Sequence, residues 1–387
     1  MSVKINVNDK ETILDLSKNI TIENLIKLFP TYGTIHIDVD DILLDSKDKD
    51  VDLIRKNYIL LYVYRCLNKY KIDDQPNFVN YFVKCNSNKL DRTKKYFIGR
   101  YGIIELRMIE NYLKYGTSYI KNINDIFSKY NPGKLKEYEK KYQPNDWIGY
   151  NNPEYALIKT CTNAGFYCTN NNYTDNENTL KKFCELYLDG LKNMTFLSLC
   201  PSCKCWYLYI NKFCEHKDEI RVDLNTYFNL TDGKNVCFIS YFADHVKNLC
   251  DNGKIFNLYK TRNFTFNKLY PIKSYITTYG NYPHSNWLDT YNVLCNNIDN
   301  LVKNEKIDIF LINAGCYGIP LANYVFTKYN ISVIHEGHAM NCFFGMFTSK
   351  NYLNLDDINR ENFVEVTQDF YKDIKSLEYW NAEGYWK

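Results

Sequence analysis

Three short stretches combine glycine with charged or titratable residues at spacings that suit the binding of an anion. They are GRYGIIE (residues 99–105), NAGCYG (residues 313–318) and HEGH (residues 335–338). Each comes directly after an apolar run typical of a buried strand. Glycine lets a ligand approach the backbone closely, and the free N–H groups at the start of a following helix favour a phosphate or a carboxylate.

GRYGIIE places a cation and a carboxylate on either side of Gly102. Arg100 could pair with a diphosphate, and Glu105 could act as a general base or as a ligand of a metal ion. A salt bridge between Arg100 and Glu105 that fixes the turn is the structural alternative. The sequence leaves both interpretations open.

NAGCYG is expected to form the turn between a strand and a helix. Gly315, Cys316, Tyr317 and Gly318 would present their backbone to a ligand, and Pro320 fits the first helical turn, where its missing N–H costs nothing. The G-x-x-G spacing differs from the dinucleotide fingerprint. The alternatives are an anion site and a tight structural turn.

HEGH ends the next expected strand, beside the same crevice, where open α/β sheets bind ligands. His335, Glu336, Gly337 and His338 are therefore candidates for contact with a phosphate or with sugar hydroxyls. H-E-x-H lacks the spacing of a helical zinc-protease motif, and one of the two histidines could be structural.

Two further stretches carry residues that could bind a ligand. YPHSNW (residues 282–287) could present His284 and Trp287 to a sugar, although a helix start with a core tryptophan is the more common explanation. CPSCKCWYLYINKFCEH contains a possible zinc set, but it lacks the usual loop spacing, and reduced thiols are favoured over metal. The cluster consists of Cys200, Cys203, Cys205, Cys214 and His216.

The elements that must position these residues alternate between strands and helices from about residue 96 onward. Near-continuous apolar runs at residues 235–242 and 307–315 suit strands buried on both faces of a parallel sheet. Helical patterns occupy residues 105–113, 177–194 and 285–302. The fold class predicted for residues 96–387 is therefore α/β, a Rossmann-like, doubly wound, mostly parallel sheet.

Residues 1–70 have the pattern of a separate small α+β unit of order ββαββ, similar to a ubiquitin-like module, followed by a linker at residues 71–95. It could dock a protein partner or a second copy of the chain, or be an extra lobe without a binding role.

Composition limits the classes of partner and compartment. The chain has 387 residues, a formal net charge of +3 and 14 cysteines. The small charge gives no electrostatic reason to expect nucleic acid, and no apolar stretch is long enough to span a membrane. The N-terminus lacks the pattern of a signal peptide, so the cysteines indicate a reducing compartment. The abundance of tyrosine and asparagine suits an AT-rich genome, such as that of a protist, a low-GC bacterium or a large DNA virus.

Five stretches in the same order resemble bacterial proteins with a GT-D-like glycosyltransferase domain, which belong to polysaccharide biosynthesis. Residues 313–347 are similar to the family segments GCGAYGLPLA and KQAIHLGGATQLLFGIKG, and residues 98–113 are similar to the family turn RFGSVEL. The other three are PEYALIKTCTNAGFYCTNN, GKNVCFISYFADHVKN and YWNAEGYWK, and the resemblance spans about residues 97–387.

The resemblance implies a glycosyltransferase of the hexosyltransferase type, with a nucleotide-sugar donor such as a UDP-sugar and a glycan or protein acceptor. The reducing compartment that the cysteines indicate would be the cytoplasm. If the chain is viral, it would act in the host cytoplasm or be part of the virion. Enzymes of this family carry Asp-x-Glu after Arg-Phe-Gly, and that pair is tied to Mn²⁺ or Mg²⁺. Here Glu105 is kept and Ile103 stands at the Asp position, so metal dependence is open. The alternative is a catalytically inactive nucleotide-sugar-binding or structural, virion-associated protein on the same fold.

Overall fold

A computed structural model describes two separate parts of the chain. Its described residues are 2–7, 10–15, 35–37, 90–91, 93–117, 153–169, 173–198, 218–220, 222, 224–278, 281–337, 339–347, 358–359 and 361–371. The chain divides into two compact units, one of residues 1–86 with 144–149 and 200–212, and the other of residues 87–143, 150–199 and 213–387.

In the first unit, three strands form an antiparallel sheet. They are β1 (Ser2–Val7), β2 (Lys10–Asp15) and β3 (Ile35–Ile37), in the order β2-β1-β3. The expected helix at residues 22–29 and the expected strand at residues 58–64 lie outside the described residues. The ubiquitin-like order therefore stays a prediction.

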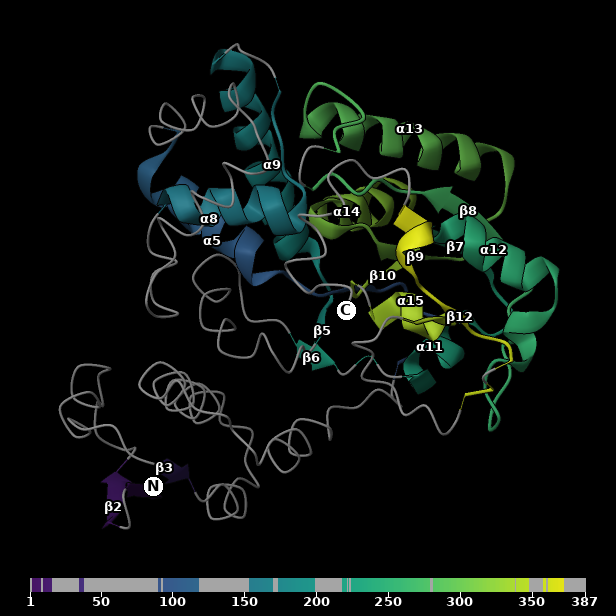
Figure 1. The fold of residues 1–387 in the computed structure, drawn as a ribbon, viewed down its shortest axis with the longest axis horizontal. Coiled ribbons are helices and arrows are strands. Elements are labelled where there is room, and N and C mark those ends of the chain that lie inside the picture. The colour runs from purple at the N-terminus through teal and green to yellow at the C-terminus, as the bar shows by residue number, and fades with distance from the viewer. Residues whose placement is uncertain are drawn as a thin grey trace. The chain divides into compact units, whose positions relative to one another are not determined.

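The second unit is built on a seven-stranded sheet in which every neighbouring pair is parallel (Figure 1). Its order is β6-β5-β4-β10-β9-β7-β8. The strands are β4 (Phe97–Gly99), β5 (Phe196–Ser198), β6 (Asp218–Ile220), β7 (Asn235–Ser240), β8 (Lys268–Lys273), β9 (Ile309–Asn313) and β10 (Ser332–His335). The predicted α/β class with a parallel sheet is confirmed.

Helices connect these strands, as parallel pairing requires. They are α5 (Ile103–Tyr115), α8 (Pro153–Lys159), α9 (Tyr173–Asn193), α11 (Leu224–Thr231), α12 (Ala243–Asp251), α13 (Trp287–Asn304), α14 (Gly318–Tyr329) and α15 (Ala339–Phe343). Shorter turns are η3 (Thr160–Ala164), η5 (Lys254–Asn257), η6 (Gly315–Tyr317) and η8 (Gln368–Tyr371), and β11 (Met346–Phe347) pairs with β12 (Val364–Glu365).

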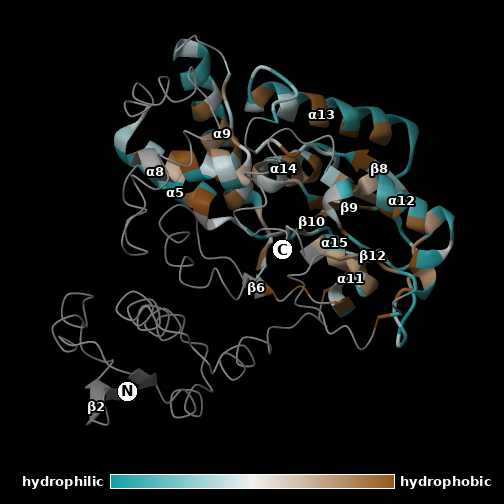
Figure 2. Cartoon of the chain, viewed as in Figure 1, coloured by the Kyte–Doolittle hydropathy of each residue, from teal (hydrophilic) through white to brown (hydrophobic). Residues whose placement is uncertain are grey.

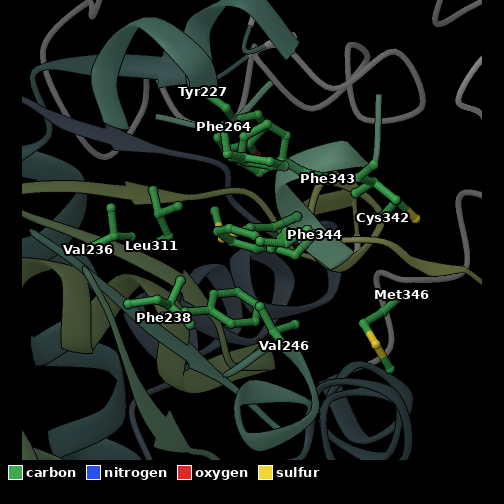
Figure 3. Packing of buried hydrophobic residues seen from close by; sticks show 14 of the residues in the cluster. Tyr227, Val236, Phe238, Val246, Phe264, Leu311, Cys342, Phe343, Phe344 and Met346 are labelled. Atoms are coloured by element: carbon green, nitrogen blue, oxygen red, sulfur yellow. The ribbon is translucent and has the colours of Figure 1, made fainter. Parts of the chain in front are cut away.

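Alternate residues of each central strand serve opposite faces of the sheet. Ile98, Leu311 and Ile334 join one large apolar cluster with the side chains of α11, α12 and α15, which also contains Phe238, Tyr227 and Phe343 (Figure 3). On the other face, Phe97 contacts Phe326 of α14. We call these the α11–α15 face and the α14 face. Helices cover both, which makes the sheet doubly wound (Figure 1).

Local sequence signals explain the helices nearest the site. The side chain of Asn286 accepts a hydrogen bond from the N–H of Asp289 at 2.9 Å and so caps α13. Helix α14 has Pro320 in its first turn and ends at Asn330 in the left-handed conformation, at φ +52°. Helix α13 carries both hydrophobic and hydrophilic residues along its length (Figure 2), and its hydrophobic residues Trp287, Leu294 and Ile298 are buried.

Candidate functional site

The carboxyl ends of β4 and β10 bring two of the glycine turns side by side. The backbone N–H of Arg100 donates to the carbonyl of His335 at 2.8 Å, and its Nη1 donates to the carbonyl of Glu336 at 3.3 Å. A Cβ added to Gly337, which has a φ of +70°, would lie 4.0 Å from the same Nη1. GRYGIIE and HEG therefore form one site. The Arg100 guanidinium lies between the two turns and is held there by its hydrogen bond to the Glu336 carbonyl.

Glu105 lies in the first turn of α5, folded back over Gly102. A Cβ on Gly102 would be 1.8 Å from the Glu105 Oε2 atom, so any other residue there would displace the Glu105 carboxylate from this position. Burial raises the pKa of the Glu105 carboxyl, while its own backbone N–H and the nearby Arg100 charge lower it. The salt bridges between described residues include none between Arg100 and Glu105. The guanidinium acts on this carboxyl through its field.

The NAGCYG turn reaches the same edge through β9, the other neighbour of β10. Gly315 has a φ of +52°, a conformation that favours glycine, and a Cβ there would lie 3.0 Å from the carbonyl oxygen of Ala164. Cys316 is fully buried, and its Sγ accepts a hydrogen bond from Trp287 Nε1 at 3.1 Å. Tyr317 is buried too. From Gly315 to Tyr317, the backbone rather than a side chain is therefore suited to contact a ligand.

His335 occupies the space beside Gly318. A Cβ on Gly318 would lie 2.0 Å from His335 Cε1, and Gly318 itself has an ordinary helical φ of −59°. His335 Nδ1 lies 2.9 Å from the carbonyl oxygen of Ile312, so the Nδ1–H tautomer satisfies both atoms. This glycine is therefore required for packing against the imidazole, whatever the turn binds.

The charge of His335 differs from what a contact with a phosphate would favour. Burial lowers the pKa of His335 to about 4, and Arg100 lowers it further, against the hydrogen bond to Ile312. The imidazole is neutral at physiological pH. In this state the imidazole adds no positive charge to the site, and Arg100 is the permanently charged side chain of the GRYGIIE and HEG turns.

Two other candidate contacts with a sugar lie beside the core. Trp287 is 0 % exposed and stacks with Tyr291 and Tyr317, so the expectation that it contacts a sugar is wrong in this structure. His284 is half-buried, its Nδ1 lies 2.9 Å from Thr290 Oγ1, and its ring packs edge-on against Tyr275. Both support the start of α13 from within the fold.

The remaining candidates lie outside the described residues. His338 and the cysteine cluster Cys200, Cys203, Cys205, Cys214 and His216 belong to this group. Among the residues that the structure does describe, no group of three or more His, Cys, Asp or Glu side chains could hold a metal ion. The cysteines within the described ranges are all free.

Three polar residues join the candidates through the fold, because the sequence does not single them out as site residues. Ser198 and Ser240 end the strands β5 and β7, and both are buried. Tyr227 of α11 is buried close enough to Arg100 and Glu336 for both charges to act on its hydroxyl. The signal in the sequence was positional, because the two serines are the polar residues that close apolar runs.

Comparison of the chain with models of known families, with curated proteins and with solved structures finds no match. Within the described ranges, no helix has the length and apolar character needed to cross a membrane.

Proposed function

We propose that this chain binds a nucleotide diphosphate sugar at the carboxyl edge of its sheet and transfers the sugar to an acceptor hydroxyl. The observation that carries the proposal is the position of Arg100, held between the ends of β4 and β10 and directed by the carbonyl of Glu336. A fixed guanidinium at a strand end, beside a glycine turn that opens a helix, suits a diphosphate.

Charge develops on the diphosphate as the sugar departs, and the site would stabilise it in two ways. Arg100 supplies a permanent positive charge, because a guanidinium stays protonated in proteins. The Gly315 turn leads into the start of α14, where the helix dipole would favour an anion.

Glu105 is the proposed general base that takes the proton from the acceptor hydroxyl. Its pKa is raised by burial, and a base works best when its pKa lies near the working pH. The same carboxyl lies in the field of Arg100. The proposed base would therefore lie close to the cation that would face the leaving group.

The residues that would bind a divalent ion differ between this chain and the family that it resembles. Ile103 stands where those enzymes carry aspartate, and an aliphatic side chain cannot bind a cation. Glu105 would be the one carboxylate that the GRYGIIE turn offers to Mn²⁺ or Mg²⁺. Activity measured with and without each ion tests this dependence.

The competing function is a non-catalytic binding or structural protein on the same fold, and Ile103 is its motivation. Both functions predict nucleotide-sugar binding if the pocket is retained. Only the enzyme predicts hydrolysis or transfer of the sugar, and only a purely structural protein predicts that no nucleotide sugar binds.

Binding of UDP and a panel of nucleotide sugars, measured by calorimetry, tests the proposal. We expect Arg100→Gln to weaken UDP binding by about 10-fold or more, since it removes a charge-assisted contact. Arg262→Gln is the matched control, because exposed Arg262 contacts Asn225 and Asn229 instead. Failure of the wild-type protein to bind any nucleotide or nucleotide sugar would contradict the proposal.

A further inference from the structure

Adjacent strands end in a continuous row of polar residues on the α11–α15 face. The register of the sheet pairs Ser240 with Asn313, His335 with Ile312 and with Gly99, and Gly99 with Leu197. One residue further along, on the opposite face from His335, come Glu336, Arg100 and Ser198. From one side of the sheet to the other, the row consists of Ser198, Arg100, Glu336, Asn313 and Ser240.

Two helices cover this row. Helix α15 is fixed to it by a hydrogen bond of 3.0 Å between Ser240 Oγ and Asn341 Oδ1. Helix α11 contributes Tyr227, whose ring stacks on Phe343 of α15 with centroids 4.2 Å apart (Figure 3). Aromatic side chains of α11 and α15 therefore cover the row. The Gly315 turn and the His335 ring lie on the opposite, α14 face of the sheet.

Two hydroxyl groups at this row have no hydrogen-bond partner. Ser198 is 2 % exposed and Tyr227 is 4 % exposed, and in the described part of the chain neither Ser198 Oγ nor the Tyr227 hydroxyl is paired. Leaving a buried hydroxyl unpaired destabilises the folded protein, because the group loses its hydrogen bonds to water. Such a cost is common where the missing partner is a ligand.

The Tyr227 hydroxyl lies close to the charged members of the row. Burial is the main cause that raises the pKa of Tyr227 far above its ordinary value, the Glu336 carboxylate raises it further, and Arg100 lowers it. The phenol is therefore neutral and able both to donate and to accept. Ser198 lies next to Arg100 in the row, on the other side from Glu336.

We propose that this row is the subsite for the hydroxyl groups of the donor's sugar, with Tyr227 and Ser198 as the residues that determine which sugar is accepted. Because Arg100 and Glu336 carry opposite charges, the row as a whole suits a neutral polyol better than a second anion. Hydroxyl groups both donate and accept, which matches the mixture of donors and acceptors here. This subsite rests on the proposed function and extends it to the sugar.

The subsite predicts discrimination by hydrogen bonding. A pocket that pairs its buried polar groups with substrate hydroxyls rejects sugars that place a hydroxyl elsewhere, because its own groups are then left unpaired. UDP alone would contact Arg100 through its diphosphate, but it lacks the sugar that would reach Tyr227 and Ser198.

The test compares UDP with UDP-hexose binding by the wild-type protein and by Tyr227→Phe and Ser198→Ala. We expect each change to weaken the preferred UDP-hexose by about 10-fold and to leave UDP affinity unchanged. Tyr227→Phe should not lower the melting temperature, because it removes an unpaired buried hydroxyl. Tyr259→Phe is the control, since the Tyr259 hydroxyl donates to the Phe343 carbonyl at 2.9 Å. It should lower the melting temperature and leave the affinity ratio between UDP-hexose and UDP unchanged.

Two results would overturn the subsite, and they differ in what they say of the proposed function. If UDP-hexoses bind and both variants keep the wild-type ratio between UDP-hexose and UDP, the row holds water or nothing, while nucleotide binding stands. If the wild-type protein binds neither UDP nor any UDP-hexose, the subsite and the proposed function fail together.

Discussion

Burial shifts the two titratable side chains beside Arg100 towards their neutral forms. The pKa of Glu105 is raised and that of His335 is lowered, in both cases mainly because the charged form loses its hydration. Of these three side chains, Arg100 alone keeps its charge at every pH at which the protein is folded, because a guanidinium does not lose its proton. A site of this kind can hold an anion over a wide pH range.

The lowered pKa of His335 should make the stability of the folded protein depend on pH in the acid range. Its pKa is about 4 when folded, against 6.5 for an ordinary histidine, so acid favours the unfolded chain, which takes up the proton first. The stabilisation from a neutral His335 is complete above the unfolded pKa and is lost as the pH falls towards 4. It amounts to about 3 kcal/mol at most.

His335→Asn keeps a donor for the Ile312 carbonyl but cannot titrate. We expect the free energy of unfolding of this variant to fall less than that of the wild-type protein between about pH 7 and pH 4.5. Urea titrations at several pH values measure the difference. An identical acid dependence in both proteins would mean that His335 does not carry this effect.

At the scale of elements, helix α14 and strand β10 fit together through one glycine. Gly318→Ala would place a methyl group 2.0 Å from the His335 ring. We expect a loss of about 2–4 kcal/mol in stability, more than the gain in helix propensity can offset.

The double variant Gly318→Ala with His335→Ala tests the cause of that loss. Removing the ring opens the space that the new methyl group needs, so the double variant should be less destabilised than the sum of the two single changes. Additive losses, measured by chemical denaturation, would show that the methyl group meets something other than the imidazole.

Element positions could be predicted from the sequence wherever periodicity was strong. The pattern at residues 285–302 predicted α13 to within two residues at each end. Helix α9 begins at Tyr173, earlier than the predicted start at residue 177, because its first turn is polar and carries no apolar period. The buried position of Trp287 agrees with the more common explanation of a tryptophan at a helix start, a core residue, and not with the alternative of contact with a sugar.

At the scale of the whole molecule, the apolar runs predicted a parallel sheet, but not the order of its strands. β4 and β10 are neighbours although Arg100 and Glu336 are 236 positions apart, and no local pattern records that pairing. The polar row depends on this order. Arg100, Asn313 and Glu336 belong to stretches that stand out in the sequence, whereas Ser198 and Ser240 do not. The five residues form a set only when the strands are placed side by side.

The cysteine cluster remains a prediction at this scale. Cys200, Cys203, Cys205, Cys214 and His216 lie outside the described residues, and the sequence favours reduced thiols over zinc. We expect purified protein to contain no stoichiometric zinc and its melting temperature to be unaffected by EDTA. One zinc per chain that is lost on changing Cys200 and Cys203 would contradict this.

The most direct test of the central claim is the rate of sugar transfer or, without an acceptor, of donor hydrolysis, by Glu105→Gln. If Glu105 is the base, the change should lower turnover by about 100-fold or more while donor affinity changes little. Because burial disfavours its charge, the neutral variant should be at least as stable as the wild-type protein at neutral pH.

Glu110→Gln is the matched control on the same helix, because Glu110 pairs with Arg107 at 2.7 Å. It should keep wild-type turnover. Assays with and without Mn²⁺ and Mg²⁺ separate a base from an ion ligand, since loss of an ion ligand would also weaken donor binding. We expect turnover to fall steeply in Glu105→Gln and to stay at the wild-type value in Glu110→Gln. Wild-type turnover that is indifferent to this change and to both ions would place the chemistry elsewhere in the molecule and contradict the role of Glu105.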